Sequence, residues 1–121
     1  LTPQLPRAYN TLGLAYARLS QLERAIKEFD QAIRLDPRLA SAYNNRGFVY
    51  RELGQSDKAI EDLDHSIRLD SELAFAYYNR SLAHTIKGND SEAQRDFELA
   101  VALGFDPVSL KAAIDQLKQS R

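Results

Sequence analysis

The sequence predicts an all-α fold built from stacked helical hairpins, and two observations support this prediction. The chain of 121 residues matches itself when it is displaced by 34 residues, and a second displacement of the same size continues the match. Within each copy, apolar residues recur every three or four positions, as they do along one face of a helix. Repeats of about 20 to 50 residues are typical of solenoids, in which neighbouring units bury each other's apolar faces.

The copies agree in residue type at corresponding positions. Ala8-Tyr9-Asn10 corresponds to Ala42-Tyr43-Asn44, and Ile33-Arg34-Leu35-Asp36 corresponds to Ile67-Arg68-Leu69-Asp70. The third copy keeps the register at Ala76-Tyr77, Ala93, Phe97 and Val101-Ala102-Leu103. We therefore predict one domain over residues 1–121, with repeats at 6–39, 40–73 and 74–107.

Each repeat is predicted to contain two helices. In the first repeat, one apolar stripe is formed by Ala8, Tyr9, Leu12, Ala15, Tyr16 and Leu19, and a second by Leu22, Ala25, Ile26, Phe29, Ala32 and Ile33. Ser20 followed by Glu23 has the pattern of a capping box that starts the second helix. Asp36-Pro37 ends this helix because proline cannot continue the backbone hydrogen bonds. In the later repeats, Gly54 and Gly88 mark the turn between the helices.

A seventh helix is predicted over residues 108–119. Asp106 can cap its N-terminus, and Pro107 suits its first turn. The helix has one apolar face, formed by Leu110, Ala113, Ile114 and Leu117, and polar residues elsewhere. Such a helix can cover the apolar face that the last hairpin of a stack leaves open.

The repeated residues resemble those of the tetratricopeptide repeat. The resemblance is carried by Tyr9-x2-Leu12-Gly13-x2-Tyr16, by Ala25-x3-Phe29, and by Ala32 and Pro37. The later copies depart from the pattern at Arg46, Ser66, Ser71, Arg80, Ser81, His84 and Phe105. The resemblance implies a right-handed superhelix in which the first helix of each pair lines a concave groove that binds a peptide or a partner protein.

The residues on the remaining face of those first helices are the candidates for peptide binding. Phe48, Phe75, Tyr78 and Leu82 lie off the core stripe, and apolar side chains on an outward face indicate a partner surface. The alternative is that the curvature of the superhelix half-buries them. The full predicted set is Asn10, Leu14, Asn44, Asn45, Phe48, Phe75, Tyr78, Asn79 and Leu82.

Asn45 and Asn79 stand one repeat apart on this face. Because an amide side chain both donates and accepts hydrogen bonds, such a ladder could pair with the backbone of an extended peptide of any sequence. The alternative is that these side chains brace neighbouring helices. Family members that hold the acidic C-terminal tails of chaperones have two Lys, one Arg and two Asn at five groove positions, and only Asn45 matches them here. We therefore expect no binding of such tails.

Two arginines replace an apolar core residue of the first repeat. Arg46 and Arg80 stand where the first repeat has Leu12, and each precedes an aspartate, Asp62 or Asp96, by 16 residues. Antiparallel helices could bring each Arg and Asp together as a structural ion pair. The alternative is that both arginines reach an anionic ligand.

The composition argues against several other functions. The 16 Lys and Arg residues are interspersed with 17 Asp and Glu residues, so no basic surface for nucleic acid is expected. No apolar stretch approaches the ~20 residues that a membrane-spanning helix needs. The chain has no Cys, and its two His residues, His65 and His84, are too far apart in sequence to suggest a metal site. No catalytic or nucleotide-binding motif is present, so we expect a non-enzymatic protein without a cofactor.

The sequence therefore predicts a protein–protein interaction scaffold. Two alternatives stay open: the chain could be the targeting domain of a larger enzyme, or a self-assembly module that forms homo-oligomers. Residue 1 is Leu, so we expect a fragment or a processed product. A targeting segment could be missing, so the localisation is unknown, and cytoplasmic only by default.

Overall fold

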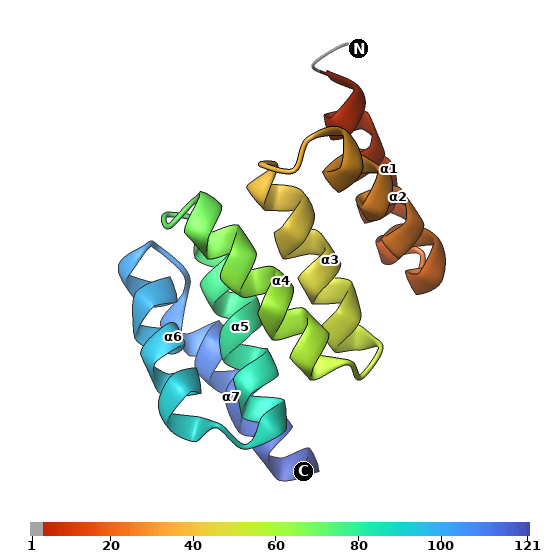
Figure 1. The fold of residues 1–121 in the computed structure, drawn as a ribbon. Coiled ribbons are helices and arrows are strands. Elements are labelled where there is room, and N and C mark those ends of the chain that lie inside the picture. Colours follow the sequence, from red (N-terminus) through yellow and green to blue (C-terminus); the bar gives the residue numbers. More distant parts are fainter. Residues whose placement is uncertain (1–3) are drawn as a thin grey trace.

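The computed structural model describes residues 4–121, which form seven α-helices and no strand. Figure 1 shows them in chain order: α1 (Gln4–Arg18), α2 (Leu22–Leu35), α3 (Ala40–Glu52), α4 (Ser56–Leu69), α5 (Ala74–Lys87), α6 (Asp90–Ala102) and α7 (Pro107–Ser120). The most extensive contacts join α1 to α2, α3 to α4, and α5 to α6. The predicted all-α solenoid of three hairpins with a C-terminal capping helix is confirmed.

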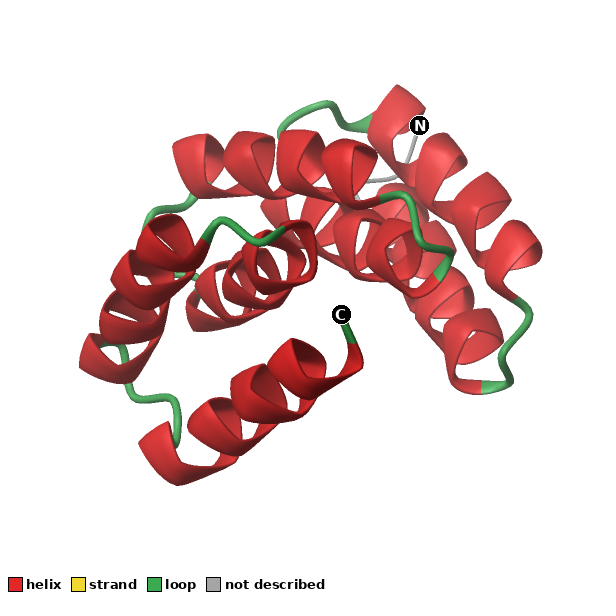
Figure 2. Ribbon diagram, turned by 90° about the horizontal axis from the view of Figure 1, so that it is seen from below, coloured by secondary structure: helices red, strands yellow, loops and turns green. Residues whose placement is uncertain are grey.

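The hairpins are stacked side by side along an arc. Each hairpin packs on the next one through α2 and α3 or through α4 and α5, and the first helices α1, α3 and α5 also contact one another in sequence. Figure 2 shows the arc, with the C-terminus on its inner side. The last helix, α7, packs mainly against α5 and less against α6.

Small residues allow the two helices of a hairpin to approach closely. A Cβ atom on Gly13 would lie 2.5 Å from the ring of Phe29, and one on Gly47 would lie 2.8 Å from Leu63. Real Cβ atoms essentially never lie so close, so a larger residue at either position would force Phe29 or Leu63 to shift. The third hairpin has Ser81 at this position, and its hydroxyl donates a 2.8 Å hydrogen bond to the Ala93 carbonyl oxygen. The two helices of the third hairpin are therefore also joined by a polar contact at this position.

The turns between paired helices need left-handed backbone. Gly54 and Gly88 have φ angles of 77° and 81°, as their residue type predicts. The equivalent residue in the first hairpin is Ser20, with φ of 60°. The predicted capping box is therefore wrong, because Ser20 closes α1, and Gln21 stands at the N-cap of α2 without a side-chain hydrogen bond.

The helix α7 is capped as the sequence predicts. The Asp106 carboxylate accepts a 3.0 Å hydrogen bond from the Ser109 backbone N–H, and Pro107 occupies the first turn. The Leu110 side chain of α7 is fully buried, and Ile114 is 8% exposed. Together with Tyr77, Leu82 and Ala100 they form the apolar core of the last hairpin.

The N-terminal end of the stack differs from the predicted stripe of α1. Leu12 is 42% exposed and Leu19 is 66% exposed, and Ala8 and Ala15 are exposed as well. In the later hairpins the counterparts of Ala8 and Ala15 are fully buried against the preceding hairpin, namely Ala42, Val49, Ala76 and Ala83. The apolar residues do recur on one side of α1 as predicted. Within the described residues, however, no hairpin precedes α1 to cover half of this stripe.

The two core arginines form ion pairs of identical geometry. Arg46 binds both carboxylate oxygens of Asp62 at 2.8 Å, and its third nitrogen lies 2.9 Å from Asp30 on the preceding hairpin. Arg80 binds Asp96 in the same way, and it also reaches Asp64 of the preceding hairpin at 2.8 Å. The hydrogen bonds that Arg46 donates to Asp62 raise the pKa of Arg46 above its ordinary value. Each arginine therefore links the two helices of its own hairpin, and it links this hairpin to the preceding one. This agrees with the prediction that the Arg and Asp residues form structural ion pairs.

We predict that Asp62→Asn lowers the free energy of unfolding by about 2–3 kcal/mol, because it leaves a largely buried guanidinium without its bidentate partner. The Asp62 residue is 5% exposed. The matched control is Asp30→Asn, which removes the outer arm of the same network. Its side chain is 54% exposed, so a loss below about 1 kcal/mol is expected. Urea denaturation measures both, and equal losses in the two variants would contradict the assignment.

Candidate functional site

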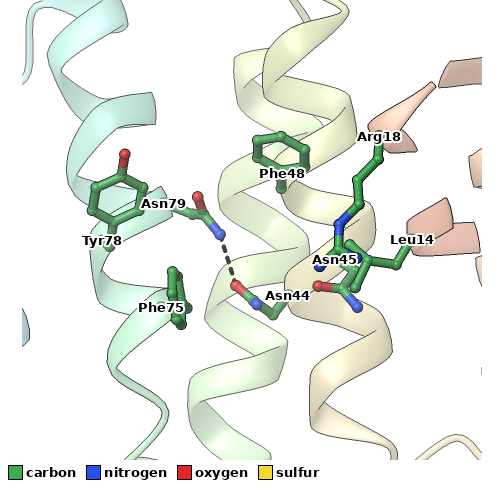
Figure 3. A pocket seen from close by; sticks show the side chains of 8 residues that line it. All are labelled: Leu14, Arg18, Asn44, Asn45, Phe48, Phe75, Tyr78 and Asn79. Carbon is green, nitrogen blue, oxygen red and sulfur yellow. Dashed lines mark hydrogen bonds between the residues drawn. The ribbon is translucent and has the colours of Figure 1, made fainter. Parts of the chain in front are cut away.

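The first helices of the three hairpins enclose a hollow of about 350 Å³, which we call the central hollow. Its walls are mainly apolar side chains, with amide groups between them. Figure 3 shows its lining: Leu14 and Arg18 from α1, Asn44, Asn45 and Phe48 from α3, and Phe75, Tyr78 and Asn79 from α5. Seven of the nine residues that the sequence predicts for peptide binding line this hollow.

The two other predicted residues lie elsewhere. Leu82 is 3% exposed and belongs to the core that α7 completes, so the prediction that it faces a ligand is wrong. Leu82 lies outside the apolar stripe of α5 that packs against the neighbouring hairpin. The capping helix α7 covers the side of α5 on which Leu82 lies. Asn10 does not line the hollow. Its Oδ1 atom instead accepts a hydrogen bond from the Asn45 side chain.

Three aromatic rings gather at the end of the central hollow that is nearest α7. Phe75 is 57% exposed, and its ring meets those of Tyr78 and Phe105 edge-on, at centroid distances of 6.2 and 5.3 Å. Tyr78 and Phe105 are stacked at 4.4 Å. Phe75 and Tyr78 also line a second hollow of about 520 Å³, beside Leu103, Phe105 and Ser109. Phe75 is therefore an exposed apolar ridge between two hollows.

The asparagine side chains connect neighbouring first helices. The Asn79 Nδ2 donates a 2.9 Å hydrogen bond to the Asn44 Oδ1, which Figure 3 shows as a dashed line. The Asn45 Nδ2 donates to the Asn10 Oδ1 at 3.0 Å, and Asn10 donates in turn to the Ser41 hydroxyl. These pairs support the alternative interpretation, in which the amides brace adjacent hairpins.

The hydrogen bonds between helices leave some donor and acceptor positions of each amide without a partner. An amide offers two donor hydrogens and an oxygen with two lone pairs, and each hydrogen bond described above uses only one of them. In Figure 3 the Asn79 carbonyl oxygen points away from Asn44. One amide can therefore hold a neighbouring helix and still present a polar atom to the hollow.

The central hollow has a positive electrostatic character. Its lining includes Arg18 but no acidic residue. Arg51, one turn beyond Phe48, places its guanidinium over the Phe48 ring at 5.4 Å from the ring centroid. Burial lowers the pKa of Arg51, because a desolvated guanidinium is less stable in its charged form.

Comparison with known proteins decides the family. A family model described as "TPR repeat" matches residues 18–54, and one described as "Tetratricopeptide repeat" matches residues 40–73. Residues 18–73 of the chain contain repeats of the tetratricopeptide family. Among curated proteins, none matches the chain significantly.

Solved tetratricopeptide structures share this fold. The first such domain of Spaghetti (RPAP3), bound to the HSP90 peptide SRMEEVD, has a TM-score of 0.88 at 20% identity, with 99% of this chain and 95% of that chain covered. The second Spaghetti domain, bound to the same peptide, has a TM-score of 0.80 at 28% identity, with 83% and 93% covered. MamA is 33% identical with a TM-score of 0.76, and the match covers 85% of this chain and 60% of MamA.

The tetratricopeptide pattern alone did not predict that Arg18 and Phe105 lie at the two hollows. Arg18 follows Leu14 by four residues, so helical spacing places both on one face of α1, and this spacing would have identified it. Phe105 occupies the position of Pro37 in the first repeat, between helices, where periodicity gives no orientation. The five groove positions that were compared with tail-binding family members carry no cation, namely Asn10, Leu14, Asn45, Phe75 and Asn79.

We predict that Asn79→Ala lowers the free energy of unfolding by about 1–3 kcal/mol, because it leaves the Asn44 carbonyl oxygen without its donor. Asn44 and Asn79 are 7% and 4% exposed, so water replaces the lost bond poorly. Asn45 is less buried, so Asn45→Ala should have a smaller effect. Thermal or urea unfolding of both variants measures the difference. A fully stable Asn79→Ala variant would show that the amide is not a brace.

Proposed function

We propose that this domain is a protein-interaction scaffold that binds an extended peptide segment of a partner in the central hollow. This proposal is supported by the hollow, which collects residues from all three first helices, the helices that the family resemblance implies line a concave groove. We propose no catalytic activity and no cofactor.

The exposure of Phe75 is the observation that carries this proposal. An aromatic ring that is 57% exposed beside a largely apolar hollow loses contact with water when a ligand side chain packs on it. Aromatic anchors of this kind dominate the binding energy of many interfaces. The unused amide atoms of Asn45 and Asn79 supply partners for the backbone N–H and C=O groups of an extended peptide.

The relatives support a peptide as the class of ligand. The second Spaghetti domain is bound to an HSP90 peptide in its structure, and the present chain covers 93% of that domain. The acidic tail itself is not the ligand that we propose, because the five positions that hold such tails carry no cation in this chain. The domain could equally serve to target a larger enzyme, since targeting uses the same surface.

We predict that Phe75→Ala weakens the binding of a partner peptide at least tenfold, which corresponds to about 1.4 kcal/mol. Stability should change little, because the ring is largely exposed. Peptides selected from a random library against the wild-type domain supply the probe, and isothermal titration calorimetry measures the affinity. The matched control is Val108→Ala, which removes an apolar side chain that is 75% exposed and lies outside the lining of the hollow. Unchanged affinity in Phe75→Ala would contradict the proposal.

The exposed face of α1 favours self-association as a second candidate function. Ala8, Leu12, Ala15 and Leu19 alternate small and large side chains along this face. Two copies of α1 packed antiparallel would place Leu12 opposite Ala15 and Leu19 opposite Ala8, so that each large side chain meets a small one. At the other end of the stack, α7 already covers the last hairpin, so a symmetric pairing of N-terminal faces fits better than a head-to-tail one.

If the domain self-associates through α1, Leu12→Glu should yield a monomer at concentrations where the wild type is a dimer. Light scattering coupled to size-exclusion chromatography measures the mass. Phe75→Asp is the control that separates the two surfaces, because it should leave a dimer formed through α1 intact. A monomeric wild type, or a monomer produced only by Phe75→Asp, would exclude pairing through α1.

A further inference from the structure

Arg51 is buried without a full set of partners. Its side chain is 10% exposed, and its Nε atom has no hydrogen-bond partner among residues 4–121. Within the described chain, Glu52 brings the one carboxylate near Arg51. Its Oε2 atom lies 3.7 Å from the Arg51 Nη1 atom. This distance is too long for a strong charge-assisted hydrogen bond. Leaving such a donor buried and unpaired costs free energy.

The other arginines of the first helices show how the chain treats a structural guanidinium. The Arg46 and Arg80 side chains are both 20% exposed, and each is held by two aspartates at 2.8–2.9 Å. Arg51 is more buried than either, yet it has no comparable partner. A purely structural role therefore does not explain why the Arg51 guanidinium is buried without a close acceptor.

The position of Arg51 connects it with the central hollow. It continues the stripe of α3 that contains Asn44 and Phe48, one turn further along the helix. Its guanidinium covers the ring of Phe48 at 5.4 Å from the ring centroid. Phe48 and Tyr78 both line the hollow. A ligand that fills the hollow would therefore lie close to a cation that lacks an acceptor.

A second cation borders the same space, and no charge of the opposite sign balances it. Arg18 lines the hollow from α1, and no carboxylate lies within 4 Å of it among the described residues. The chain as a whole has one more acidic than basic residue, 17 against 16, so the absence of acids from this lining is a local feature. Arg18 is exposed, so it attracts an anion less strongly than the more buried Arg51 does.

We infer that the central hollow selects peptides in which an acidic side chain stands close to a large apolar one. The apolar side chain packs against Phe48, Phe75 and Tyr78, and the carboxylate pairs with Arg51, with Arg18 as a second cation at the edge. This inference rests on the proposed function, since it names the chemistry of the peptide that the hollow binds.

The carboxylate is that of a side chain and not of a chain terminus. The side chains that line the hollow are neutral apart from Arg18, so the lining has no cluster of cations for a terminal carboxylate. An acidic side chain within a peptide needs a single guanidinium beside an apolar anchor, and Arg51 next to Phe48 provides that arrangement.

The test uses a random heptapeptide library with acetylated N-termini and amidated C-termini, screened against the full chain. Selected peptides should contain Asp or Glu at a fixed distance from a large apolar residue. Replacing that Glu by Gln in the best peptide should weaken binding about tenfold, the size expected for a charge-assisted pair. In Arg51→Gln the Glu and Gln peptides should bind equally well. The matched control is Arg68→Gln, an exposed arginine of α4, which should keep the preference for Glu.

The outcomes separate this inference from the proposed function. Selected peptides that bind in the hollow but show no preference for acidic residues would overturn the inference and leave the proposed function intact. A library that yields no binder sensitive to Phe75→Ala would overturn both. If Arg51→Gln fails to fold, Arg51→Lys keeps the charge and should keep the preference for Glu, whereas Arg18→Gln should reduce it. A peptide that gains affinity from a free C-terminal carboxylate would show that the anion is a terminus.

Discussion

The whole structure depends on the close contact between the helices of each hairpin and the first helix of the next. Glycine at positions 13 and 47 brings paired helices so near that a methyl group would collide with Phe29 or Leu63. Hairpins packed in this way bury one side of every first helix and leave the opposite side free. The central hollow is formed by these free sides, so its shape follows from the packing of the repeats and needs no dedicated loop.

Close packing also determines which polar groups need partners. Several polar side chains of the first helices find a partner on an adjacent hairpin: Asp30 and Asp64 for the core arginines, and Asn44 for Asn79. Buried Ser81 and Thr85 find theirs within their own hairpin. A buried polar group without a partner costs more than a paired one contributes. Against that pattern, Arg51 is the exception among the described residues, and it lies where a ligand would bind.

The sequence predicted the helices and most of the hollow, because both follow from periodicity. A 34-residue repeat with a 3.6-residue stripe identifies which side of each helix is buried, and the other side then gives Asn45, Phe48 and Tyr78. Periodicity says nothing about what covers the ends of the stack. For this reason the burial of Leu82 beneath α7 and the exposure of Leu12 on α1 were both missed. Nor does it distinguish an amide that contacts a ligand from one that braces a helix, as Asn79 does.

The central claim is that a peptide occupies the hollow between α1, α3 and α5. Side-chain amide signals in a ¹⁵N-labelled sample test it most directly, because Asn44, Asn45 and Asn79 line the hollow, whereas Asn89 lies in the turn before α6. Titration with a selected peptide should shift the three signals from the hollow and leave that of Asn89 in place. Shifts confined to Asn89 and the backbone of α2, α4 and α6 would place the ligand on the opposite face and contradict the account.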